Sequence, residues 1–133
     1  MGMSAEETLI RAFVDPAESE RLVEYLEIEG TREMLWDELA QPGALDPRFA
    51  EEIPLEEQSP ESIEQKLRSM GAPEVCRIVS LDADLDGLEL NLCDAMDWVF
   101  GLGQPVFLSC IPGKIAYYES EDGERRLLER FGE

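Results

Sequence analysis

Short apolar runs alternate with turn sequences between residues 75 and 130, and this pattern limits the possible folds more than any other feature. Residues 111–114 read Ile-Pro-Gly-Lys. Proline at the second position presets its own φ, and glycine at the third accepts the positive φ of a type II turn. The flanking runs, 106–110 and 115–118, are rich in β-branched and aromatic residues. The pattern therefore predicts an antiparallel hairpin.

Two Asp-Gly dipeptides mark further turns in the same region. Asp86-Gly87 separates residues 75–81 from residues 88–92. The second of these runs alternates apolar and polar residues, which is typical of a half-buried strand. Asp122-Gly123 precedes residues 124–130, which fit either a third strand of a meander or a short terminal helix.

One helix is predicted inside the strand region, near residues 93–100. Cys93 or Asp94 is expected to cap it, and Gly101 to end it. Its apolar residues recur at helical spacing: Ala95, Met96, Val99 and Phe100.

The first half of the chain carries helix signals. Ser4 with Glu7 forms a capping box, and Asp15 and Ser59 each stand before a proline, the residue favoured at the first helical position. Residues 1–71 are predicted to be mainly helical, over about 4–14, 15–30, 31–40 and 59–70, with an irregular proline-rich stretch at 42–59. Met34, Leu35 and Leu39 are expected to face inward.

Together these signals predict one α+β domain over residues 1–133. N-terminal helices pack on a C-terminal, mainly antiparallel sheet of four to five strands in the region 75–130. A chain of 133 residues with 44% hydrophobic residues is large enough for a proper core.

The charge restricts the possible partners. The chain has 31 acidic and 11 basic residues, a net charge of −20. Such a charge repels phosphate backbones and anionic lipid surfaces, so the sequence predicts binding neither to nucleic acid nor to a membrane. It favours basic proteins as partners, or only solubility.

Several classes of chemistry lack their usual residues. There is no histidine, which removes the commonest general base and metal ligand. Three cysteines without framework spacing, and no signal-peptide pattern, predict free thiols in the cytoplasm. Gly101-Leu102-Gly103 lacks the third glycine of a dinucleotide fingerprint. No cofactor and no catalytic residue is predicted.

The candidate metal ligands are Asp82, Asp84 and Asp86. With Gly87 they copy the first six positions of an EF-hand loop, but position twelve is Cys93 where the loop requires a bidentate glutamate. A weak Ca²⁺ site remains one interpretation, and a polar turn is the other.

The remaining candidates have structural interpretations beside functional ones. Cys110, next to the turn at 111–114, is a nucleophile only if its pKa is lowered; otherwise it is a small buried residue. Tyr117 and Tyr118 are expected to point to opposite sides of one strand. The apolar stripe of its helix places Trp36 at the edge of that face or in solvent. For both tryptophans and both tyrosines together, the favoured interpretation is that they mostly line the core, and the alternative is an exposed aromatic at a protein interface.

The sequence favours a non-catalytic binding module whose acidic surface engages a basic protein, as an inhibitor, an immunity protein or a nucleic-acid mimic does. The alternative is a small-molecule or weak Ca²⁺-binding domain that uses the loop 82–86 or a pocket between helices and sheet. An enzyme with carboxylate or cysteine chemistry is the third hypothesis.

Overall fold

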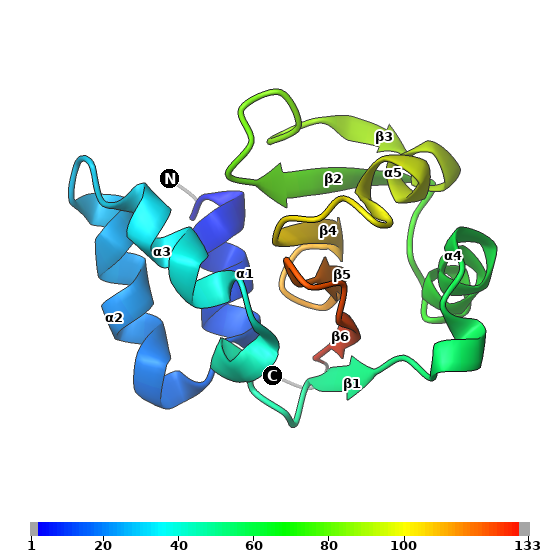
Figure 1. Ribbon diagram of the computed structural model, residues 1–133, viewed down its shortest axis with the longest axis horizontal. Helices are drawn as coiled ribbons and strands as arrows, with labels where there is room; N and C mark the ends of the chain where they lie inside the picture. The colour runs from blue at the N-terminus through cyan, green and yellow to red at the C-terminus, as the bar shows by residue number, and fades with distance from the viewer. Residues whose placement is uncertain (1–2, 131–133) are drawn as a thin grey trace.

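A six-stranded sheet separates two groups of helices in the computed structural model, which describes residues 3–130 (Figure 1). The α-helices are α1 (Ala5–Phe13), α2 (Pro16–Glu27), α3 (Arg32–Leu39), α4 (Pro60–Ser69) and α5 (Leu92–Val99). Short 3₁₀ helices, η1 and η2, span Pro42–Ala44 and Leu55–Glu57. The strands are β1 (Ala50–Glu52), β2 (Val75–Ser80), β3 (Glu89–Asn91), β4 (Val106–Ile111), β5 (Ile115–Glu119) and β6 (Arg125–Glu129).

Every strand pair in the sheet is antiparallel, and the order is β1-β6-β5-β4-β2-β3. The predicted α+β class is confirmed, and residues 125–129 are a strand and not a helix. The predicted number of four to five strands is too low. The additional strand is β1, the first along the chain, and it lies inside the segment 42–59 that was predicted to be irregular.

The predicted turn at residues 111–114 is present. The N–H of Lys114 donates to the carbonyl of Ile111 at 2.9 Å, and Gly113 has a φ of 74°. Only glycine adopts that φ without strain. The turn joins β4 to β5 at the centre of the sheet, and so places the two most buried strands side by side.

The predicted helix starts are confirmed in the N-terminal half. Ser4, Asp15 and Ser59 each accept a hydrogen bond from a backbone N–H in the first turn, at 3.1, 2.9 and 3.1 Å. These bonds satisfy N–H groups that lack a partner within the helix.

The helices cover both faces of the sheet (Figure 1). Helices α1, α2 and α3 pack on one face, where Phe107 and Tyr118 join their core. Helices α4 and α5 pack on the other face, where Leu108 and Tyr117 join a second core. The adjacent tyrosines point to opposite sides of β5, as strand alternation predicts. Both are fully buried because helices cover both faces of the sheet.

Two predictions about α3 are wrong. Trp36 is buried, with 2% of its surface exposed, and its ring nitrogen donates to Glu6 of α1 at 2.9 Å. Met34 is 49% exposed, although it was expected to face inward. The helix presents Leu35, Trp36 and Leu39 to the core, a stripe rotated by one residue from the predicted one.

No helix within residues 3–130 is both long enough and apolar enough to cross a membrane.

Candidate functional site

Helix α5 begins at the end of β3 and is fixed at its start by two hydrogen bonds. The side chain of Asn91 accepts from the N–H of Cys93 at 3.0 Å, and the N–H of Leu92 donates to the carbonyl of Glu74 at 2.8 Å. Asn91 is therefore the cap, and the assignment to Cys93 or Asp94 is wrong. The helix starts one or two residues earlier than predicted because β3 delivers a good capping residue directly to it.

One side of α5 is buried and the other is open. Leu92, Ala95, Met96 and Val99 are completely buried in the core shared with α4. The exposed residues are Cys93, Asp94, Asp97 and Trp98. Counted from Cys93, the other three residues follow after one, four and five positions. This spacing places all four on one side of the helix, which we call the α5 face.

Trp98 is the unusual member of the α5 face. It is 56% exposed, whereas the other tryptophan, Trp36, is 2% exposed. A large aromatic side chain in water forgoes the stabilisation of burial, of the order of 2 to 3 kcal/mol for a side chain of this kind. Asp94 lies one helical turn before Trp98 and Asp97 is its neighbour in sequence, so two carboxylates share the α5 face with the ring.

The carboxylates of the α5 face carry uncompensated charge. Among residues 3–130, no lysine or arginine nitrogen lies within 4.0 Å of a carboxylate oxygen of Asp94 or Asp97. By contrast, Glu64 on the neighbouring α4 is paired with Arg68 at 3.0 Å. The two aspartates are therefore free to attract a cation or a basic side chain.

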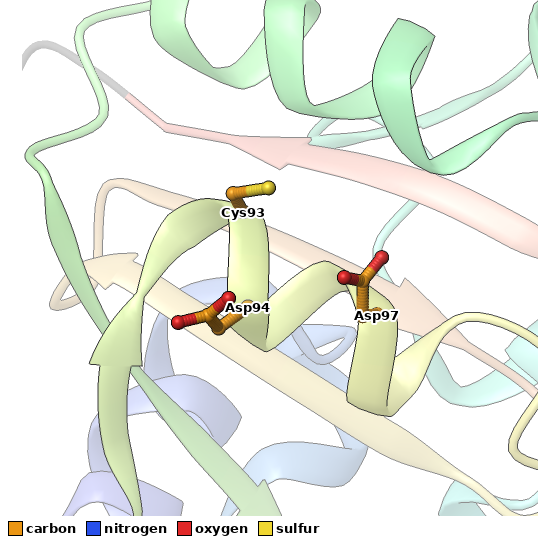
Figure 2. A group of neighbouring side chains, drawn as sticks. All are labelled: Cys93, Asp94 and Asp97. Carbon is orange, nitrogen blue, oxygen red and sulfur yellow. The ribbon is translucent and has the colours of Figure 1, made fainter.

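Cys93, Asp94 and Asp97 could in principle hold a metal ion. Their ligand atoms lie within 4.8 Å of one another, and all three side chains project from α5 (Figure 2). Zinc accepts both thiolate and carboxylate ligands, but the thiol must first lose its proton. The negative charge of Glu64, together with desolvation and the charges of Asp97 and Asp94, raises the pKa of Cys93. At neutral pH the thiol therefore keeps its proton unless a bound cation displaces it.

The three aspartates predicted as calcium ligands lie in the turn between β2 and β3. Two of them are used by the turn itself: Asp82 accepts from the N–H of Asp84 at 2.9 Å, and Asp86 accepts from the N–H of Ser80 at 3.0 Å. Asp86 also pairs with Arg32 of α3 at 3.3 Å. Within the described residues these three carboxylates do not gather into one metal-sized group. The calcium site stays a prediction, and the observed bonds support the polar-turn interpretation.

Cys110, considered above as a nucleophile, is buried at the end of β4. A hydrogen bond to Cys76, together with burial, raises the pKa of the Cys110 thiol far above its ordinary value. Lys114, the nearest cation in sequence, is exposed at the turn. Cys110 alone is therefore not an activated nucleophile.

The space between the sheet and helices α1 and α3 is filled. Between α1, α3 and the sheet, next to Trp36 and Phe107, the remaining cavity is about 10 Å³. That is about the room for one water molecule, whereas ligand pockets usually measure about 300 to 1,000 Å³. A pocket of about 390 Å³ lies instead at the surface, between the start of α1 and the strands β2 and β4, with Val75 and Arg77 on its wall.

Comparison of the chain with protein-family models, with curated proteins and with solved structures finds no match. The function therefore has to be argued from the α5 face and the surface around it. Sequence reasoning found the apolar stripe of α5 but left the position of Trp98 open. The signal was available, because Trp98 lies off the stripe formed by Ala95, Met96 and Val99.

Proposed function

We propose that this protein is a non-catalytic binding module that engages a basic protein through the α5 face. The observation that carries the proposal is a half-exposed tryptophan, Trp98, that shares the α5 face with two exposed carboxylates, which have no ion-pair partners among residues 3–130. Tryptophan is enriched among the residues that dominate binding energy at protein interfaces. Surrounding carboxylates would select for lysine and arginine on the partner and speed the encounter.

A second exposed apolar site competes with this assignment. Ile28 and Met34, at the junction of α2 and α3, are 56% and 49% exposed, and Glu24 and Glu27 lie nearby in sequence. We favour the α5 face because tryptophan buries more apolar surface than either aliphatic side chain. The competing site supplies a matched control.

The test compares capture of proteins from the source lysate by four forms of the chain. These are the unmodified protein, Trp98→Ala, the pair Asp94→Asn with Asp97→Asn, and the pair Glu24→Gln with Glu27→Gln. The two double variants remove the same charge from opposite sides of the molecule. We expect a basic protein to be retained by the unmodified protein and by the Glu24/Glu27 variant, and to be lost from the other two. High salt should elute it.

Two results would contradict the proposal. One is equal loss from both double variants, which would show only a general attraction to negative charge. The other is retention by Trp98→Ala. Tryptophan fluorescence provides an independent readout, because Trp36 is buried and a change in emission on adding the purified partner should come from Trp98.

The small-molecule alternative rests on the surface pocket beside Arg77 and Val75. Thermal-shift screening with metabolites and with Ca²⁺ separates it from the binding module, since a ligand bound to the native state raises the melting temperature.

A further inference from the structure

Cys76 and Cys110 lie side by side on the two strands that form the middle of the sheet. The register of β2 and β4 pairs Arg77 with Ser109 and Ile78 with Leu108. Continued by one residue, this register sets Cys76 opposite Cys110, at the position where β4 shifts its register with β5 between Ser109 and Ile111. Both cysteines belong to the core on the α4 and α5 side, so their side chains lie on the same face.

The backbone hydrogen bonds identify which kind of antiparallel pair this is. The N–H of Ile78 donates to Leu88 at 2.9 Å, and its carbonyl accepts from Gly87 at 2.8 Å, so the peptide groups of Ile78 point away from β4. The direction of the backbone N–H and C=O groups repeats every second residue along a strand, so the peptide groups of Cys76 also point away from β4. In the continued register Cys76 and Cys110 are therefore a non-hydrogen-bonded pair, the type in which a regular ladder sets the Cα atoms about 4.5 Å apart and the side chains closest.

That spacing permits a covalent bond between the two sulfurs. Disulfides join residues with Cα atoms about 4.4 to 6.8 Å apart. Both side chains belong to the same core, and each thiol is the largest influence on the pKa of the other. No large movement of the strands is needed to bring the sulfurs together.

The two thiols have unequal roles. The hydrogen bond from Cys110 and the positive charge of Arg68 lower the pKa of Cys76, against the opposing effects of burial and of Glu74. The same hydrogen bond and burial raise the pKa of Cys110. Cys76 is thus the thiol that loses its proton first, and Cys110 is the neighbour that keeps its own. Only 2% of the Cys76 surface and 5% of the Cys110 surface are exposed, so the oxidant has to be a small molecule.

We propose that Cys76 and Cys110 form a redox-active dithiol that a small peroxide converts into a cross-strand disulfide. The thiolate of Cys76 attacks one oxygen of hydrogen peroxide; the S–O bond forms, the O–O bond breaks, and the departing hydroxide takes up the proton released by Cys76 to become water. The sulfur of Cys110 then attacks the sulfur of the resulting sulfenic acid. The S–O bond breaks, and hydroxide leaves with the proton of Cys110 as a second water. The two thiols lose two electrons and the peroxide gains them.

The third cysteine makes a sharp experiment possible. Cys93 is exposed and outside the pair, so Cys93→Ser leaves one possible internal disulfide. This variant is treated with hydrogen peroxide, unfolded in N-ethylmaleimide and digested with trypsin. We expect mass spectrometry to find the peptide 69–77, with Cys76, joined to the peptide 78–114, with Cys110. The mass of the joined species should be the sum of the two peptide masses minus two hydrogens. Reduction should separate the two.

The reduced protein provides a second measurement without oxidant. Phenylarsine oxide binds two adjacent thiols at once, so one adduct per folded chain is expected for Cys93→Ser and none after the further change Cys76→Ser. In a Cys93→Ser, Cys110→Ser variant, peroxide should leave Cys76 as a sulfenic acid that dimedone traps. Recovery of both cysteines of Cys93→Ser as maleimide adducts, or as sulfinic acids without a joined peptide, would overturn the proposal.

Discussion

Glu119 is the most constrained charged residue of the protein. It is completely buried at the end of β5, and its carboxylate accepts hydrogen bonds from Tyr117 at 2.7 Å, from the N–H of Gly101 at 2.8 Å and from Arg125 at 3.2 Å. The guanidinium of Arg125 also lies 4.0 Å from the ring centre of Phe100. One carboxylate thus ties together β5, β6 and the segment that follows α5.

Removing the Glu119 carboxylate should be costly, because three donors then lose their acceptor and Arg125 loses its counter-charge. We expect Glu119→Ala to lower the free energy of unfolding by about 3 kcal/mol, as for other broken buried ion pairs. Glu119→Gln should cost less, since its amide oxygen still accepts. Urea denaturation measures both changes. Glu56→Ala, at an exposed site, is the control and should stay within about 0.5 kcal/mol of the parent.

At the residue scale, the helical pattern misplaced Trp36 and left the position of Trp98 open. Trp36 was placed at the edge of its helix or in solvent, yet it is buried because Glu6, from another helix, accepts its ring N–H. Such a polar partner for a buried indole comes from tertiary structure, which local periodicity does not contain. The opposite directions of the tyrosines followed from strand alternation, and the burial of both depends on helices that cover both faces of the sheet.

At the element scale, the turn from residue 82 to 87 offers a direct comparison between its aspartates. Asp86 accepts from Ser80 and pairs with Arg32, so it fastens the turn to α3. The exposed Asp84 accepts no hydrogen bond from the described residues. We expect Asp86→Ala to cost about 1 to 2 kcal/mol and Asp84→Ala almost nothing, measured by chemical denaturation.

Calcium distinguishes the two interpretations of this turn. If the aspartates only build the turn, millimolar Ca²⁺ should leave both variants and the parent unchanged in melting temperature. A rise in the parent that Asp84→Ala abolishes would instead support the metal site.

Strand β1 shows where local signals stop being informative. Ala50, Glu51 and Glu52 have low strand propensity, so the sequence predicted irregular structure there. The strand forms because the edge of β6 has unpaired backbone groups: Phe49 accepts from Glu129 at 3.0 Å, and Ile53 donates to Arg125 at 3.3 Å. The turns of the C-terminal half were predictable because proline and glycine act within four residues.

These bonds predict unequal effects of proline in β1. The backbone N–H and C=O groups of residues 49 and 53 point toward β6. Because this direction repeats every second residue, the groups of Glu51 also point toward β6, and the N–H of Glu52 points away from the sheet into solvent. Glu51→Pro removes a ladder hydrogen bond and should cost about 1 to 3 kcal/mol, whereas Glu52→Pro should cost clearly less. Hydrogen exchange at Leu127 measures the local loosening. Equal losses of stability in the two variants would show that β1 does not pair in this register.

At the scale of the whole molecule, the stabilisation from burying two cores on opposite sides of one sheet must exceed the self-repulsion of a net charge of −20. The helices and the sheet could be predicted from the sequence, but the division of the helices between the two faces of the sheet could not. That division depends on the crossover from β1 through α4 to β2, and no local signal states which side a connection takes. Its consequence is that α5 and α2 display their acids on opposite sides of the molecule.

This distribution predicts how salt changes stability. A charge of this size destabilises the compact state through self-repulsion, and salt screens that repulsion. We expect the melting temperature to rise between low salt and half-molar NaCl by about 4 °C, the shift that about 1 kcal/mol produces in a domain of this size. The variant with Asp94→Asn, Asp97→Asn, Glu24→Gln and Glu27→Gln starts with less repulsion, so its rise should be smaller. A fall in melting temperature with salt would mean that the ion pairs of the arginines outweigh the repulsion, because screening weakens attraction and repulsion alike.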